Sequence, residues 1–246
     1  MCKKFKHYFV KLSAYDSKIV VAAAQALVKV TKKLDSITME EMLELAGQGA
    51  KVMQTRAVEF ANKYKVPVRV LSSFNEGSGT LISLEDNGME NSLVSGIAFQ
   101  KDQVKVTLHG VEDTPGTAFK ILGPISDAEI EVDVIVQNVS VDGKTDFTFT
   151  VSNEDQEIVK KIVEDVRQKI EFKDLIIDSD IAKVSLVGVG MRSQSGVASR
   201  TFKVLSDNDV NIQIISTSEI KITMVINEDI VDKAVQVLHK EFELDK

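Results

Sequence analysis

Two related stretches decide the fold of this chain: residues 104–116 read VKVTLHGVEDTPG, and residues 182–196 read AKVSLVGVGMRSQSG. Each copy continues into a helical stretch and then into an apolar stretch typical of a strand. That strand is EVDVIVQNVS at Glu131–Ser140 in the first copy and NIQIISTSE at Asn211–Glu219 in the second. Matching positions lie about 80 residues apart, and self-similarity at that spacing predicts a duplicated supersecondary unit.

The first copy predicts the order strand, turn, helix, strand, strand, helix. Its strands are expected at Lys105–Leu108, Glu131–Ser140 and Asp146–Val151, its helices at Thr117–Ala128 and Asp155–Lys169, and a hairpin turn at Asp142-Gly143. The second copy repeats this order, with a shorter hairpin through Glu219 and a last helix at Asp229–Phe242. The order βαββα with one further strand on each unit is the ferredoxin-like plan, so we expect an α+β fold.

Residues 36–83 precede the repeat and show different patterns. Thr38 and Glu41 have the spacing of a capping box, which predicts that a helix begins there. The elements expected next are the end of that helix at Gly47 and Gly49, a helix at Gln54–Tyr64, a strand at Val66–Ser73, a turn at Asn75–Gly79 and a linker at Asp86–Ser92.

Composition places the chain among globular proteins of a reducing compartment. Of its 246 residues 43% are apolar and 27% charged, an ordinary balance for a soluble protein that can bury a core. The net charge of −7 argues against binding to nucleic acid. Cys2 is the single cysteine, which excludes an intrachain disulfide and favours a cytoplasmic location. The three histidines are scattered, so we expect no metal site.

The first 35 residues differ from the rest in charge. They hold eight lysines against Asp16 and Asp35, a net charge of +6, so the remainder carries −13. The apolar run Ile19–Val30 is too short to span a membrane. Because it follows a basic start, a signal peptide is one interpretation. The alternative, which we favour, is an amphipathic or poorly ordered N-terminal helix.

Four motifs carry a resemblance to a known family. They read TLHGVEDTPGTA at Thr107–Ala118, VQNVS at Val136–Ser140, KVSLVGVG at Lys183–Gly190 and ISTSE at Ile215–Glu219. In this order they resemble the paired ACT domains of aspartate kinase, and residues 36–83 resemble the end of its kinase domain. The resemblance implies tandem ferredoxin-like βαββαβ ACT domains preceded by a short remnant of the amino-acid-kinase domain. The implied parts are a basic segment at 1–35, the kinase remnant at 36–90, and ACT domains at 91–172 and 173–246.

The resemblance is greatest to the lysine- and threonine-regulated class, in which a shorter regulatory (beta) subunit exists. The family's nucleotide- and aspartate-binding domain has no counterpart before residue 30. We therefore expect a regulatory subunit or truncated kinase, with no catalytic residues, no cofactor and no enzyme activity of its own. The family activity is ATP-dependent phosphorylation of L-aspartate. The expected partners are a second copy of the chain, a full-length kinase subunit and the effector, L-lysine or L-threonine or both, but neither nucleic acid nor a membrane.

The residues themselves suggest how such an effector binds. A helix start offers free N–H groups and a favourable dipole to a carboxylate. Gly116 permits close approach of a ligand to the backbone, and Pro115 stiffens the turn before the helix. Asp113 can face an ammonium group. Gln137, on the neighbouring strand, can donate or accept a hydrogen bond.

In the family, effector lies between the first ACT unit of one chain and the second unit of its partner. The positions that the resemblance implies are Asp113, Gly116, Thr117, Ala118, Asp133, Gln137 and Ser140 in the first unit and Asn211, Ile212, Thr217, Ser218 and Glu219 in the second. In the second copy Ser195 stands where Pro115 stands in the first, so the Asp-x-Pro-Gly pattern is lost. We expect the first copy to be the main binder.

Structural interpretations exist for each of these motifs. Asp-x-Pro-Gly is a common turn, Gln137-Asn138 can be polar residues of an edge strand, and Thr217-Ser218 can be a solvated strand end. The run Gly77-Ser78-Gly79 lacks the lysine of a phosphate loop and is expected to be a turn. We expect Asp178 and Asp180 to lie in a polar linker and His109 to be packed on its apolar strand.

Three other functions remain as alternatives. One is a stand-alone amino-acid-binding ACT module, against which residues 36–83 argue. Another is a nonfunctional fragment of a kinase. An unrelated enzyme comes last, because the sequence contains no recognisable nucleophile–base pair or metal constellation.

Overall fold

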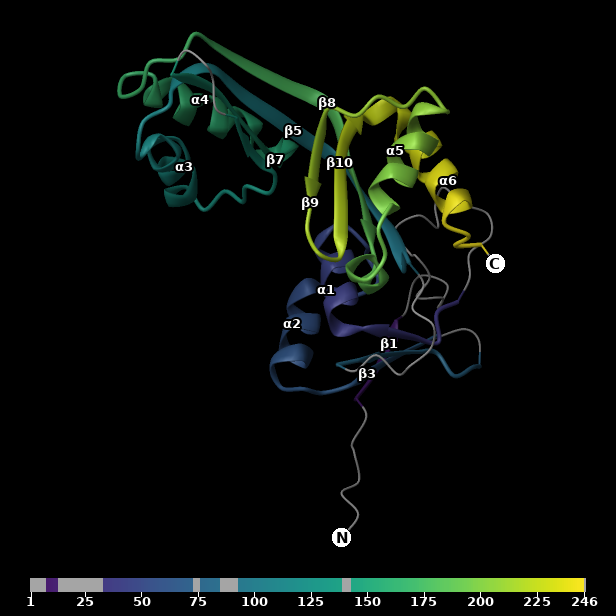
Figure 1. The fold of residues 1–246 in the computed structure, drawn as a ribbon. Helices are drawn as coiled ribbons and strands as arrows, with labels where there is room; N and C mark the ends of the chain where they lie inside the picture. Colours follow the sequence, from purple (N-terminus) through teal and green to yellow (C-terminus); the bar gives the residue numbers. More distant parts are fainter. Residues whose placement is uncertain (1–7, 13–32, 73–75, 85–92, 139–142, 246) are drawn as a thin grey trace. The chain divides into compact units, whose positions relative to one another are not determined.

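The computed structural model describes residues 8–12, 33–72, 76–84, 93–138 and 143–245 (Figure 1). The chain divides into two compact units. Unit 1 comprises residues 1–100 and 183–246, and unit 2 comprises residues 101–182. The two long strands β5 (Gly96–Glu112) and β8 (Asp174–Val187) each contribute residues to both units.

Unit 2 contains the first copy of the repeat. Its elements after β5 are α3 (Thr117–Asp127), β6 (Ile135–Gln137), β7 (Lys144–Ser152), the short 3₁₀ helix η1 (Asn153–Asp155), α4 (Gln156–Val166) and the first part of β8. The strand order is β6-β7-β5-β8, and β7 is antiparallel to both β5 and β6. This is the ferredoxin-like order, in which the first and third strands of the unit are the central pair.

Alternation along β7 explains how unit 2 forms its core. Phe147, Phe149 and Val151 are buried, while the residues between them are polar. Both helices pack against these strands, α3 through Ile121 and Ile125 and α4 through apolar residues at helical spacing (Figure 1). One face of the sheet is thereby removed from water, which supplies the main driving force for folding this unit.

The second copy lies in unit 1. Its elements after β8 are η2 (Val189–Arg192), α5 (Val197–Ser206), β9 (Ile214–Thr217), β10 (Lys221–Asn227), η3 (Glu228–Ile230) and α6 (Val231–Glu241). The strand order is β5-β8-β10-β9. The fourth strand of this copy is thus the beginning of β5, which precedes the first copy in the chain. A hydrogen bond of 2.7 Å from Ser95 N–H to Val187 C=O joins the two segments.

Unit 1 also contains an N-terminal subdomain, described over residues 8–12, 33–72 and 76–84. Its elements are β1 (Tyr8–Leu12), β2 (Ser36–Thr38), α1 (Met39–Gly47), α2 (Thr55–Lys63), β3 (Val68–Ser72) and β4 (Thr80–Ser83). The sheet order is β1-β3-β4-β2, with parallel pairs β1–β3 and β2–β4 and an antiparallel pair β3–β4. Met39, Met42 and Val58 form its core, which also includes Val187 of β8.

The predicted helices agree closely with the structure, and the predicted capping box is confirmed. Thr38 Oγ1 accepts from Glu41 N–H at 3.2 Å, and Glu41 Oε2 accepts from Thr38 N–H at 3.0 Å. The strand β1 was not predicted. The expected linker at Asp86–Ser92, residue 142 of the hairpin turn and the apolar run Ile19–Val30 lie outside the described residues.

Two predicted strands are longer than the real ones, because residues 131–134 and 211–213 are not in strands. In the first copy the reason is a contact with β7: Thr150 Oγ1 accepts the N–H of Val134 at 3.1 Å, which takes that donor out of the ladder. The expectation of a linker at Asp178 and Asp180 is wrong, since both lie in β8. Among the described residues, no helix has the length and apolarity needed to cross a membrane.

Candidate functional site

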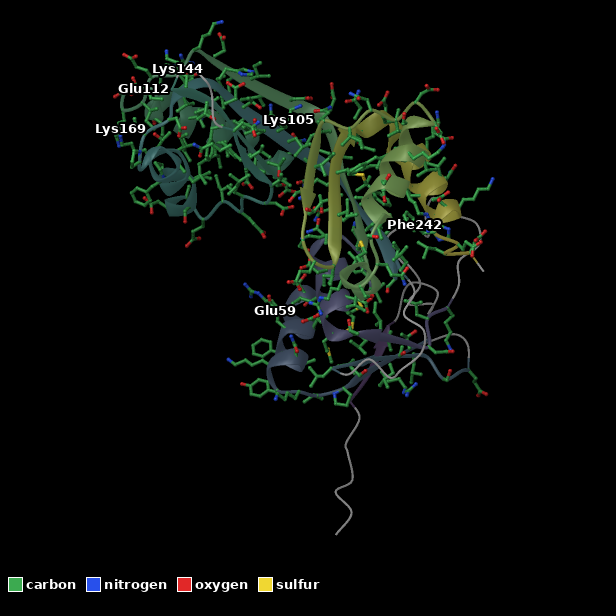
Figure 2. All side chains as sticks on the ribbon, viewed as in Figure 1. Glu59, Lys105, Glu112, Lys144, Lys169 and Phe242 are labelled. Carbon is green, nitrogen blue, oxygen red and sulfur yellow. The ribbon has the colours of Figure 1, made fainter. Side chains whose placement is uncertain are left out.

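The turn from β5 into α3 forms the first candidate site. It begins where Glu112 and Lys144 face each other at the ends of β5 and β7 (Figure 2). Asp113 N–H then donates to Gly143 C=O at 2.9 Å, which holds the turn against the β6–β7 hairpin. Thr117 is buried, and its hydroxyl donates to Glu112 C=O at 3.0 Å. Thr117 therefore fastens the helix start to the strand end.

Gly116 leaves the helix start open. It is the N-cap of α3 with φ of +93°, a conformation that favours glycine. A Cβ built on it meets nothing within 4 Å, so there is room for a ligand beside the backbone. Of the first helical N–H groups, that of Thr117 donates to Thr114 and that of Lys120 to Gly116. The N–H groups of Ala118 and Phe119 lie between these and have no intrahelical acceptor.

The structure brings together two of the predicted polar side chains. Gln137 Nε2 on β6 donates to Asp113 Oδ1 at 3.2 Å, and both side chains are exposed. The contact between Asp113 and Gln137 thus lies in the turn that leads through Gly116 into α3. Asp133 is near Thr150, to which its N–H donates at 3.2 Å, whereas Gln137 is opposite Phe147. Ser140 lies outside the described residues.

The second copy contains a pocket of about 560 Å³ at the equivalent place. It is lined by Met191, Arg192, Gln194, Gly196, Val197, Ala198, Thr217, Ser218, Glu219 and Ile222. Three of the five residues predicted for this copy, at the end of β9, are therefore in the lining, whereas Asn211 and Ile212 are not. Gly196 is the N-cap of α5 with φ of +96° and open space at its Cβ, as in the first copy.

Arg192 is a pocket residue that sequence reasoning missed. Its Nε atom lies 3.2 Å from Glu219 Oε2 at the end of the β9–β10 hairpin. Its Nη2 atom lies 3.0 Å from Glu40 Oε2 on α1. The only signal in the sequence was a basic residue within the turn that precedes α5, GMRSQSG. Its two acidic partners are distant in the chain, so no spacing reveals them.

His109 is not packed on its strand as expected. Its side chain is 37% exposed, and Nδ1 lies 3.0 Å from Asp146 Oδ2. Asp146 Oδ1 also accepts the N–H of Gly110 at 3.0 Å. This backbone hydrogen bond, opposed by burial and aided by His109, lowers the pKa of Asp146 below its ordinary value of 3.8. Within the described part of the chain, no group of three or more His, Cys, Asp or Glu residues has the arrangement of a metal site.

Comparisons with known proteins agree with the duplicated fold. Two family models described as "ACT domain" match residues 106–171 and 184–242. An aspartate kinase of Pseudomonas fluorescens is 57% identical over 220 residues, which are 89% of this chain and 53% of that protein. An aspartokinase of Corynebacterium efficiens is 42% identical over 229 residues, or 92% of this chain and 54% of that protein. The chain spans about half the length of these curated relatives.

Solved structures of aspartate kinases and their subunits are also similar to this chain. A chain from a crystal structure of aspartokinase alpha and beta subunits is 46% identical with a TM-score of 0.58, covering 61% of this chain and 99% of that chain. The regulatory subunit of aspartate kinase from Thermus thermophilus, in its ligand-free form, is 32% identical with a TM-score of 0.58, with the same coverage of 61% and 99%. A Clostridium acetobutylicum aspartate kinase with a TM-score of 0.82 is 22% identical and supports the fold alone.

Proposed function

This chain belongs to the aspartate kinase family, and we propose that its two ACT domains form a regulatory region that binds L-lysine, L-threonine or both. In this proposal the phosphorylation of L-aspartate takes place in a kinase domain, and effector binding to the ACT domains lowers its rate. The kinase domain can belong to the same polypeptide or to a separate subunit. The observation that carries the proposal is the contact of Asp113 with Gln137 beside the open helix start at Gly116.

The first site has what an amino acid zwitterion requires. The N–H groups of Ala118 and Phe119 face the position of the α-carboxylate, which the helix dipole stabilises by about 0.3–1 kcal/mol. Asp113 accepts the α-ammonium group, and Gln137 orients Asp113 while offering its own carbonyl. Thr117 and Asp133 have backbone or side-chain bonds within the protein and hold the shape of the site.

We propose that the chain forms a homodimer through its ACT domains. The edge strands β6 and β9 occupy equivalent places in the two strand orders. Each exposes an isoleucine at the same position of the repeat, Ile135 at 50% and Ile215 at 47%. Exposed strand edges with apolar side chains favour pairing with another chain. Such pairing supports an effector site completed by residues of the partner chain, as the family resemblance implies.

Contacts of the N-terminal subdomain favour control of a kinase over a stand-alone sensor. Within unit 1, Lys221 Nζ on β10 lies 2.8 Å from Glu44 Oε2 on α1. Ser185 Oγ on β8 donates to Gln48 Oε1 at 2.9 Å, and this pair is buried. A sensor that acts alone has no need of such a connection. The second ACT domain is therefore built against the segment that resembles the kinase domain.

Calorimetric titration of the chain with L-lysine and with L-threonine, separately and together, tests the proposal. We expect saturable binding of one or both. The variant Asp113→Ala should weaken binding by roughly 10- to 100-fold, since hydrogen bonds to charged groups contribute about 1.5–3 kcal/mol. The variant Gln137→Ala removes a neutral amide and should weaken binding less.

Asp127→Ala is the matched control, because Asp127 is exposed at the far end of the same helix α3. It removes one carboxylate from the same domain and should leave the affinity unchanged. Circular dichroism of each variant checks that it is folded. Equal affinity in the wild type and both site variants would contradict the assignment of this site, and absence of binding to either amino acid would contradict the proposed function.

A further inference from the structure

Glu41 is a buried carboxylate that joins three segments of unit 1. The residue is 3% exposed. Oε2 accepts from Thr38 Oγ1 at 2.8 Å and from Thr38 N–H at 3.0 Å, which caps α1. Oε1 accepts from Ser95 Oγ at 2.5 Å and from Val189 N–H at 3.0 Å. Four donors thus satisfy the buried charge, which would otherwise be very unfavourable.

The last of these bonds fixes the beginning of η2 on α1. Val189 is the first residue of η2, and Arg192 is the last. The preceding Gly188 allows close packing, because a Cβ there would lie 2.5 Å from Leu93 O and 2.8 Å from Val94 Cα. A four-residue element anchored so closely at one end has little freedom at the other. The position of α1 therefore determines where Arg192 enters the pocket of the second copy.

Arg192 is shared between that pocket and α1. Inside the pocket its guanidinium pairs with Glu219, and outside it pairs with Glu40, which follows Met39 at the start of α1 and does not line the pocket. The side chains of Arg192 and Glu40 are 45% and 55% exposed. Exposed ion pairs of this kind contribute only about 0–1 kcal/mol, so a ligand can replace one of them.

Resting on the proposed function, we infer that Arg192 binds the α-carboxylate of an amino acid in the second-copy pocket and releases Glu40 when it does so. The pocket holds a cation and an anion side by side, Arg192 and Glu219, which are the two partners that a zwitterion needs. The α-ammonium group pairs with Glu219. Arg192 then turns from α1 toward the ligand, so that occupancy of the pocket changes the contacts of the N-terminal subdomain.

This exchange has a definite sign. Glu40 competes with the ligand for Arg192, so its removal should strengthen binding. By thermodynamic reciprocity, if Glu40 weakens the binding of the ligand, the bound ligand must weaken the contact between η2 and α1. This exchange of partners requires no change in the hydrogen bonds of Glu41. They keep η2 attached to α1 while Arg192 changes partner.

Titration calorimetry with L-threonine and with L-lysine on five forms of the chain tests the inference. These are the wild type, Glu40→Gln, Arg192→Gln, the double variant and the control Glu59→Gln. We expect Glu40→Gln to bind up to about five-fold more tightly. Arg192→Gln should bind at least about ten-fold more weakly, because a charge-assisted hydrogen bond is lost. In the Arg192→Gln background, Glu40→Gln should have no effect.

Glu59→Gln is the matched control, because Glu59 is an exposed glutamate of α2 in the same subdomain (Figure 2). It changes the net charge by the same amount and should leave the affinity unchanged. Hydrogen–deuterium exchange of residues 39–47 provides a second readout. Ligand should increase exchange at the start of α1 in the wild type and not in Arg192→Gln.

The outcomes separate the inference from the proposed function. If the wild type binds neither amino acid, both are wrong. If the wild type binds but Glu40→Gln and Arg192→Gln behave like Glu59→Gln, the inference alone is wrong and the effector uses the first site. If Glu40→Gln weakens binding, Glu40 supports the pocket instead of competing with the ligand, and the proposed exchange is overturned.

Discussion

Lys105 of β5, labelled in Figure 2, forms an ion pair of 2.9 Å with Asp178 of β8, although the two lie 73 positions apart in the chain. Their side chains are only 18% and 31% exposed. Immediately before β8, Lys173 N–H donates to His109 C=O of β5 at 2.7 Å. The first part of β8 is therefore the fourth strand of the first ACT repeat, although it leads directly into the second.

Breaking this pair should destabilise unit 2. Asp178→Asn keeps the shape and the oxygen that accepts Asp180 N–H, but it removes the charge opposite a largely buried ammonium. We expect a loss of about 1–2 kcal/mol in the free energy of unfolding. Glu164→Gln, which breaks the exposed Arg167 pair in the same unit, should cost less than about 0.5 kcal/mol. Equal losses in urea denaturation would contradict the role given to Asp178.

Gly188→Ala should destabilise unit 1 by about 1–3 kcal/mol. The new methyl group would lie 2.5 Å from Leu93 O, and a backbone atom cannot move away as a flexible side chain can. Gly47→Ala is the control, because the space around Gly47 is open and alanine is the better helix former. In thermal unfolding, the melting temperature should therefore fall in Gly188→Ala. In Gly47→Ala it should rise or remain unchanged.

His239 should make stability depend on pH. The residue is 1% exposed on α6, and its Nε2 has no hydrogen-bond partner among the described residues. Burial lowers the pKa of His239 below its ordinary value of 6.5, opposed by the nearby Asp245. The folded state therefore binds the proton less readily than the unfolded state. Stability is full above pH 6.5 and falls as the pH decreases from 6.5 to the lower pKa of the folded protein.

His239→Leu should remove this contribution. The difference in melting temperature between the wild type and the variant, measured from pH 8 to pH 5, should change with pH only below about 6.5. A difference that stays constant over the whole range would show that His239 titrates alike in the folded and unfolded chain.

The proposed dimer predicts that charges on the edge strands prevent association. Ile135→Lys and Ile215→Lys place a charge on β6 and β9, where pairing would have to bury it. We expect a shift from dimer to monomer in analytical ultracentrifugation. Ile158→Lys is the control, since Ile158 is 51% exposed on α4 and not on a strand edge. A dimer that persists in both edge variants would show that another surface holds the chains together.

Local patterns predicted the helices because their causes are local. The hydroxyl of Thr38 and the carboxylate of Glu41 are three residues apart, and the helical spacing of apolar residues needs no distant partner. The strand of the first copy was predicted from residue 131, but its ladder begins at Ile135. Thr150, on another strand, takes the N–H of Val134, and no pattern within residues 131–140 reveals that contact.

Some residues of the candidate sites were likewise recognisable from local patterns, and others were not. The turn glycines Gly116 and Gly196 were recognisable from the repeat, and both have the left-handed conformation that makes them necessary. Asp113 and Gln137 were recognisable from their chemistry as groups that could bind a ligand, but their contact with each other was not predicted. Arg192 was not expected at all, because its importance comes from Glu40 and Glu219, which lie far from it in the chain.

By itself the sequence determined the duplicated βαββα order, the helix starts and the two glycine turns, since these depend on side-chain periodicity and on conformations of single residues. Only the tertiary structure decided which strand completes each repeat and which residue of α1 pairs with Arg192 of the second-copy pocket. Those features depend on hydrogen bonds and ion pairs between residues such as Lys105 and Asp178. The free energy of such contacts appears only once the chain has brought distant segments together, so no local pattern in the sequence encodes the choice of partner.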